Sequence, residues 1–328
     1  MAKPTLSKTE ISLLKTILEC AESKKIRIAL VGGVIRDTLL DIPSLDFDFI
    51  IEGEGLLFAR ELQKKISGEL KEFPNFLTAK ITGFNGAASD SIEEIDIASA
   101  RKETYLKPGA LPEVESTTIE NDLARRDFTI NTLTIDLKSF IESAQNGVDI
   151  RTQINDPFKG LEDLENKLVR ILHPKSFIDD PTRIFRACRY ASRISGDLEP
   201  QTEHFAKEAV KGGALSTISR VRIGNELSYI LAVASVRPLL KLNSLGVFGA
   251  LGFDSDCSPK IKLWQDASSK VNKREYTEYN MLLPLFLRLL TEHKSQKERE
   301  DLFVEWNLGK KILHKVDQFF ESKILNRS

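Results

Sequence analysis

The chain has 328 residues, of which 41% are hydrophobic and 29% are charged, and its formal net charge is −1 at pH 7. This length allows more than one domain with a sizeable core, while the near-zero charge excludes a generally basic nucleic-acid binder. Three separated cysteines without a CxxC pair, and four scattered histidines, exclude a zinc signature and a disulfide framework. The start of the sequence lacks the apolar core of a signal peptide, so we expect a cytoplasmic location. The most apolar later run, residues 281–290, is short and carries Arg288, which predicts a packed helix.

The first informative stretch begins with a predicted strand, residues 26–31, which is apolar and rich in β-branched side chains. Gly32 and Gly33 follow directly, and without Cβ atoms they permit a tight turn and let backbone N–H groups approach a phosphate. Residues 34–40 then have the pattern of a short helix, whose N-terminus favours anions. Arg36 lies in its first turn, where we expect its guanidinium to fork onto a triphosphate.

Two carboxylates one residue apart follow on the next predicted strand, residues 45–52. Side chains alternate along a strand, so Asp46 and Asp48 share one face while Phe47 and Phe49 point into the core. Neighbouring carboxylates repel each other unless a cation lies between them, and oxygen ligands suit Mg²⁺. An isolated Asp-x-Asp is more often a solvated strand end. Behind a glycine turn and an arginine, however, this pair predicts a site for a metal ion and a phosphate.

Strand and helix signals alternate as far as residue 137, which predicts an α/β head. We expect helices at 6–20 and 56–66, strands at 78–81, 94–98 and 129–137, a hairpin tip at 84–90 and an irregular loop at 108–118. Asp96 faces outward from its strand, and two interpretations carry equal weight. It is either a third carboxylate that assists deprotonation of a hydroxyl, or a strand-edge partner of Arg101.

After Gly147 the strand signals fade, and from residue 161 onward the chain is predicted to be almost entirely helical. Asp180 and Pro181 suit the N-cap and first position of a helix. At about 100° per residue, four arginines of that helix fall within an arc of about 120°; they are Arg183, Arg186, Arg189 and Arg193. A solvated basic face is one interpretation. A face without interleaved carboxylates is costly, however, unless it meets an anion.

Three motifs in this order resemble the nucleotidyltransferase superfamily that includes DNA polymerase β. They are similar to its class II branch, which contains bacterial-type tRNA nucleotidyltransferases and bacterial poly(A) polymerases. The motifs are GGVIRDTLL with DFD behind it (32–48), DLARRDFTIN (122–131) and DDPTRIFRACRY (179–190). The resemblance implies an α+β fold, in which a polymerase β-like nucleotidyltransferase head with a mixed sheet precedes an all-helical neck and body. The expected limits are 1–146 for the catalytic head, 147–215 for the base-selecting neck and 216–328 for the tRNA-binding body and tail.

Carried over residue by residue, the resemblance also implies roles. Asp46 and Asp48 would be catalytic and would hold two Mg²⁺ ions. The triphosphate would be bound by Gly33, Arg36 and Arg126, the base would be selected by Asp180 and Arg183, and Arg186 and Arg189 match further nucleotide-binding positions. A surface Arg–Asp pair is the simpler interpretation of Arg126, and such a pair contributes little to stability. Arg220 and Arg222 would meet RNA phosphates, or else cap their helix and pair with Glu226.

The activity implied by the resemblance is template-independent addition of C and A to the tRNA 3′ end, from CTP and ATP, with Mg²⁺ as the cofactor and pyrophosphate released. The chain departs from the commoner family pattern at Leu77, Thr132 and Asp179, and residues 103–115 resemble a subgroup with mixed specificities. An enzyme that adds only CC or only A is therefore an open alternative. A poly(A) polymerase ranks lower because we find no terminal basic run. A non-catalytic RNA-binding protein ranks lowest, because it does not need the carboxylate pair.

Overall fold

The computed structural model describes residues 2–42, 46–84, 92, 94–104, 106, 109–233, 235–269 and 281–320. The chain forms two compact units. Unit 1 comprises residues 1–106 and 111–172, and unit 2 comprises residues 107–110 and 173–328.

This division falls later than the expected end of the head at residue 146. Residues 147–172 belong to unit 1 because they pair with it through backbone bridges, Phe128 with Ile171 and Thr134 with Asn155. The rest of the expected neck, residues 173–215, lies in the same compact unit as the expected body, residues 216–328.

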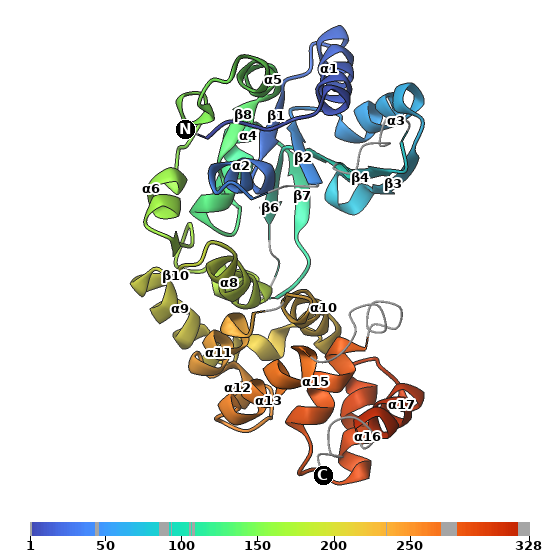
Figure 1. Cartoon of the computed structure of the whole chain (residues 1–328), viewed down its shortest axis with the longest axis vertical. Helices are drawn as coiled ribbons and strands as arrows, with labels where there is room; N and C mark the ends of the chain where they lie inside the picture. The colour runs from blue at the N-terminus through green and yellow to red at the C-terminus, as the bar shows by residue number, and fades with distance from the viewer. Residues whose placement is uncertain are drawn as a thin grey trace. The chain divides into compact units, whose positions relative to one another are not determined.

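Unit 1 is built on a six-stranded mixed sheet with the strand order β3-β4-β5-β2-β1-β8 (Figure 1). Its strands are β1 (Ile28–Val31), β2 (Asp46–Ile51), β3 (Glu69–Phe73), β4 (Thr78–Thr82), β5 (Glu94–Ser99) and β8 (Thr134–Asp136). Strands β2 and β5 run parallel, in a register that aligns Asp46 with Glu94 and Asp48 with Asp96. The other neighbouring pairs are antiparallel. The expected α+β class with a mixed sheet in the head is therefore confirmed.

Apolar side chains on both faces of this sheet anchor the helices of unit 1. These helices are α1 (Lys8–Ser23), α2 (Gly33–Leu39), α3 (Gly55–Ile66), α4 (Ile119–Ala124), α5 (Leu137–Asn146) and α6 (Gly160–Glu165), with 3-10 turns η1 (Pro74–Phe76), η2 (Thr129–Asn131) and η3 (Ile150–Thr152). One face buries Phe47 and Phe49 in a cluster with residues of α1, α3 and α5. The opposite face buries Val31 and Ile50 with Ile119 and Leu123 of α4. The sheet is thus a rigid base for the side chains at its strand ends.

Three expectations about unit 1 were wrong in detail. The loop expected at 108–118 contains β7 (Glu113–Ser116), which pairs with β6 (Arg101–Thr104) in an antiparallel ladder. The strand expected at 129–137 begins with η2, because its polar side chains form local hydrogen bonds; Thr132 Oγ1, for example, donates to the Thr129 carbonyl at 2.7 Å. We did not predict strand β3, because its charged residues obscure the apolar pattern by which a strand is recognised in the sequence. Most of the hairpin tip expected at 84–90 lies outside the described residues.

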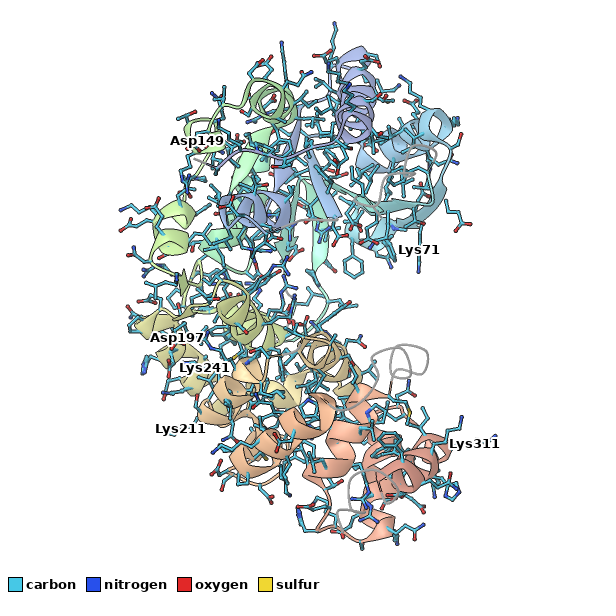
Figure 2. The ribbon with its side chains drawn as sticks, in the orientation of Figure 1. Lys71, Asp149, Asp197, Lys211, Lys241 and Lys311 are labelled. Atoms are coloured by element: carbon cyan, nitrogen blue, oxygen red, sulfur yellow. The ribbon has the colours of Figure 1, made fainter. Side chains whose placement is uncertain are left out.

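Unit 2 is helical, as expected. Its helices are α7 (Ser176–Asp179), α8 (Thr182–Arg193), α9 (Pro200–Lys211), η4 (Ala214–Thr217), α10 (Arg220–Leu231), α11 (Arg237–Ser244), α12 (Val247–Ala250), α13 (Ser258–Ser269), α15 (Leu282–Leu290), α16 (Gln296–Glu305) and α17 (Lys310–Phe320). Unit 2 also contains the two-residue strand β10 (Asp197–Leu198), and unit 1 contains the two-residue strand β9 (Leu168–Val169). Helix α8 packs against α10 and α11. Lys241 of α11 pairs with Asp197 at 2.5 Å and with Glu203 at 3.1 Å, and the first two are labelled in Figure 2.

The apolar run at 281–290 forms the buried helix α15, which confirms that expectation. Within the described ranges, no helix has both the length and the apolar character needed to cross a membrane. The cysteines are free thiols and all are buried, Cys20 in unit 1 and Cys188 and Cys257 in unit 2.

Candidate active site

The turn between β1 and α2 has the geometry that its two glycines predict. Gly32 has a φ of +68°, which is a left-handed conformation that favours glycine. A Cβ on Gly33 would lie 3.2 Å from Asp48 Oδ2, closer than side chains ordinarily pack. The backbone at the start of α2 is therefore held directly against the carboxylate of the neighbouring strand.

The two carboxylates of β2 lie on the opposite face from the core phenylalanines. Phe47 and Phe49 are buried, whereas Asp46 is exposed and Asp48 is partly exposed, so the predicted alternation is confirmed. Loss of hydration raises the pKa of Asp48 above its usual value, and the negative charges of Asp46 and Glu94 raise it further. The Arg126 guanidinium opposes this shift in the pKa. A cation would relieve the crowding of these carboxylates.

Asp96 lies beside Asp48 in the parallel β2–β5 register. Its carboxylate is 3.5 Å from Lys80 Nζ, and the same ammonium is 2.5 Å from Glu94. Burial raises the pKa of Asp96 to about 6, and nearby Asp48 contributes in the same direction. The partner that we expected, Arg101, pairs instead with Glu103 at 3.1 Å. Asp96 therefore pairs with Lys80 of the neighbouring strand β4, and β5 is an inner strand of the sheet rather than an edge. The catalytic interpretation of Asp96 stays a prediction.

The donors of this site fit Mg²⁺ that is bound together with a triphosphate. Within the described residues, no group of three or more His, Cys, Asp or Glu side chains forms a self-sufficient metal cage. Mg²⁺ is commonly held by one or two carboxylates plus substrate phosphates, and it keeps part of its water shell. Asp46 and Asp48 supply two carboxylates next to a turn where a Cβ would crowd Asp48, which matches that mode of binding.

Arg126 is anchored beside the glycine turn. Its Nε lies 3.1 Å from Asp122 Oδ2, and its Nη1 lies 3.7 Å from the position that a Cβ on Gly32 would occupy. Asp122 is fully buried and also binds Arg125 at 2.5 Å. The arginine is therefore held on a buried carboxylate, and it presents its charge to the turn between β1 and α2.

Arg36 lies in a different environment from the one that we expected. Its side chain is only 5% exposed and is 3.1 Å from Asp37, and its Nη1 donates to Asn131 Oδ1 at 2.6 Å. The Asn131 side chain donates in turn to Asp127 at 3.0 Å. This network ties α2 to the Arg-Arg-Asp motif, and sequence reasoning missed it because the residues are far apart in the chain. Direct contact of Arg36 with a triphosphate stays a prediction.

Asp180 precedes α8 and has three donors on one carboxylate oxygen. Its Oδ1 accepts from the Thr182 N–H at 3.1 Å, from Thr182 Oγ1 at 2.7 Å and from Arg222 Nη2 at 2.9 Å. In the part of the chain that the structure describes, no donor is bound to Oδ2. Pro181 occupies the N-cap position that we expected for Asp180, although the Asp180 carboxylate does cap the first turn.

The arginines of α8 do not form the single solvated face that their spacing allows. Arg183 is 6% exposed, and its Nη1 donates to Ser176 Oγ at 2.6 Å. Arg186 lies over the Tyr190 ring, 5.4 Å from its centroid. Arg189 is 3.9 Å from Glu226, the carboxylate that the sequence analysis gave as an alternative partner of Arg222. The series therefore combines a buried position with positions that contact aromatic and acidic side chains.

Arg220 and Arg222 both bind within unit 2. Arg220 Nε lies 2.8 Å from Glu305, and its guanidinium is 5.8 Å from the centre of the Trp306 ring. Arg222 binds Asp180 through Nη2, and its Nη1 donates to the Gly109 carbonyl at 2.7 Å. The pairing with Glu226, which we gave as the alternative to RNA contact, is not the ion pair that Arg222 forms. Contact of these arginines with RNA stays a prediction.

Comparison with known proteins adds independent observations. Residues 28–170 match the family model described as the poly A polymerase head domain. The chain is 39% identical over 250 residues to an A-adding tRNA nucleotidyltransferase of Halalkalibacterium halodurans, covering 75% of this chain and 55% of the relative. It is 40% identical over 217 residues to an A-adding tRNA nucleotidyltransferase of Aquifex aeolicus, covering 66% of this chain and 24% of the relative. The chain thus spans about half, or less, of the length of these curated relatives.

A solved structure extends the likeness to nearly the whole chain. It is a tRNA nucleotidyltransferase complexed with a primer tRNA and an incoming ATP analog. The TM-score is 0.70 at 28% identity, and the match covers 95% of this chain and 84% of that chain. The mixed-sheet head followed by helices is therefore the arrangement of elements found in that enzyme.

Proposed function

The chain belongs to the class II tRNA nucleotidyltransferase family, and we propose that it adds the terminal A to the 3′ end of tRNA, using ATP and releasing pyrophosphate. This proposal adopts the A-adding alternative in place of full CCA addition. The two relatives described above, which match 75% and 66% of this chain, are A-adding enzymes, which supports the choice. The departures at Leu77, Thr132 and Asp179 from the commoner pattern also favour a restricted specificity.

One observation carries the proposal. The Gly33 backbone lies against Asp48, with Asp46 on the same face of β2 and Arg126 beside the turn. A strand end with paired carboxylates, a helix N-terminus and an anchored guanidinium attracts both a cation and a polyphosphate. A non-catalytic RNA-binding protein would gain nothing from placing two carboxylates where they repel the RNA backbone.

The reaction follows from these groups. The 3′-hydroxyl of the tRNA loses its proton to solvent as its oxygen attacks the α-phosphorus of ATP, the bond to the bridging α–β oxygen breaks, and pyrophosphate leaves. Asp46 and Asp48 would hold Mg²⁺, which when bound would supply positive charge that lowers the pKa of the hydroxyl and stabilises the leaving oxygen. Arg126 binds the triphosphate, and Gly33 offers its N–H where any side chain would crowd Asp48. In this scheme the hydrogen bond from Arg36 to Asn131 fixes α2 to η2 and so holds the glycine turn in position.

Base selection is assigned to unit 2. Asp180 is fixed through Oδ1, so its second oxygen is available to accept a hydrogen bond from the exocyclic amino group of adenine. Arg183 is buried next to it at the start of α8, and a small rearrangement from Ser176 would turn a donor toward the same base edge. Guanine and uracil present a carbonyl oxygen where adenine presents its amino group, so the carboxylate would disfavour them.

The proposal is tested by incubating the chain with tRNAs that end before the CCA, after the first C and after the second C, each with labelled CTP or ATP. We expect AMP incorporation on the tRNA that already ends in CC and no CMP incorporation on the shorter ones. Addition of CMP to the shorter tRNAs would overturn the restricted specificity. Asp48→Asn should abolish incorporation, whereas Asp136→Asn, a carboxylate that caps α5 in the same unit, should retain it.

A further inference from the structure

One aromatic side chain of unit 2 is unusually exposed. Tyr229 of α10 is 61% exposed, and it is the single aromatic residue among the large apolar side chains exposed in the described ranges. An aromatic ring buries much apolar area when it is covered and is costly to leave in water. The site described above does not use Tyr229.

Arg189 and Tyr190 of α8 build a stack behind this ring. The Arg189 guanidinium lies 5.5 Å from the centre of the Tyr229 ring and 4.9 Å from the centre of the Tyr190 ring. Arg186 lies over Tyr190 in the same way. Arg189 Nε is buried without a hydrogen-bond partner, so the arginine is held in place chiefly by its ring contacts and by Glu226 at 3.9 Å. The guanidinium thus supports one side of Tyr229 and leaves most of the ring accessible.

Charge and composition indicate the kind of molecule that covers this ring. The neighbouring α8 contributes Arg186 and Arg189, against which Glu226 supplies one carboxylate. On α10 the exposed residue one turn before Tyr229 is the polar Asn225, which separates the ring from the exposed Val221, while the exposed Val233 follows four residues after the ring. An exposed aromatic ring with an arginine against its inner side is the combination with which proteins stack unpaired nucleic-acid bases.

We propose that Tyr229 is a stacking platform for an unpaired base near the 3′ end of the RNA substrate, and that Arg189 stiffens the platform from behind. This rests on the proposed function, since it takes its ligand from the tRNA acceptor end. It adds a contact for the polynucleotide that is separate from the carboxylates of unit 1 and from Asp180.

The test compares two RNA hairpins, one with an unpaired 3′ tail and one with a blunt end. The fluorescent base 2-aminopurine replaces a tail base, so stacking on a protein ring is read as quenching. We expect Tyr229→Ala to weaken binding of the tailed hairpin about 5- to 100-fold, the range typical of one stacked base, and to restore the fluorescence. Binding of the blunt hairpin should not change. Tyr229→Phe and Tyr229→Trp should retain both tail binding and quenching.

Val304→Ala is the matched control, because this side chain is 58% exposed on α16 of the same unit. It should affect neither hairpin. Equal affinity of wild type and Tyr229→Ala for the tailed hairpin would overturn the platform, and so would an equal loss for both hairpins. The two proposals fail separately, because AMP addition by the wild type tests the function and tail-dependent binding tests Tyr229.

Discussion

Replacing Asp180 by Asn separates base selection from helix capping. The Thr182 N–H and Oγ1 can still bind the amide oxygen, since Asn caps a helix about as well as Asp. The ion pair with Arg222, whose side chain is 28% exposed, becomes a hydrogen bond from the charged guanidinium to a neutral amide oxygen. That change weakens it by about 1 kcal/mol, which is on the order of 2–4 °C in melting temperature for a unit of this size.

Selectivity should change far more than stability. In the variant an NH₂ donor replaces Oδ2, so it faces the amino group of adenine, donor against donor. An unmatched polar group costs about 1–3 kcal/mol, so the preference for ATP over GTP and UTP should fall by about 5- to 150-fold. Single-turnover incorporation of each of the four nucleotides into a tRNA ending in CC gives the ratios.

The matched control is Asp197→Asn. Asp197 also accepts a backbone N–H, from Leu198 at 2.8 Å, and pairs with a cation, Lys241, in the same unit. This control should lose comparable stability or less and keep the four-nucleotide ratios. If Asp180→Asn also keeps the ratios, Asp180 is only a cap and the assignment of base selection is refuted.

Further outcomes are expected for the same site. Asp46→Ala and Asp48→Ala should each lower incorporation by about two decades or more while the melting temperature of the metal-free protein is kept, because metal charge stabilisation is lost and a repulsion is removed; near-normal turnover in Mg²⁺ would contradict the metal assignment. Gly33→Ala should reduce incorporation strongly, because its Cβ would lie 3.2 Å from Asp48 Oδ2, and circular dichroism should show the fold retained. Arg222→Ala should relax base choice through Asp180, and unchanged nucleotide ratios would contradict that link; if Arg222 also contacts RNA phosphates, the same variant should make the salt dependence of tRNA affinity shallower.

Features set by adjacent residues could be predicted from the sequence. The alternation of Asp46 and Asp48 with Phe47 and Phe49 requires only the two-residue period of a strand. The glycine turn is likewise local, because the left-handed φ of Gly32 needs no distant partner.

Features that depend on distant pairings could not be predicted. Arg36 is buried against Asn131, to which it donates a hydrogen bond. The two residues are 95 positions apart in the sequence, so no local pattern indicates this contact. Arg222 pairs with Asp180 across 42 residues, where helical spacing suggested Glu226. A one-dimensional pattern gives the face on which a charge lies, and only the packing of elements gives its partner.

The reactivity of the three buried cysteines can be used to measure local opening of the fold. Burial raises the pKa of Cys188 and raises that of Cys257 to about 11, so neither provides a thiolate at neutral pH while the fold is closed. The rate at which an alkylating reagent modifies each thiol therefore measures how often the surrounding region opens. Cys20 gives this rate for unit 1, and Cys188 and Cys257 give it for unit 2. Mass spectrometry can follow the three modification rates while ATP, Mg²⁺ or tRNA is added. A ligand that slows modification at a cysteine stabilises the unit that contains it.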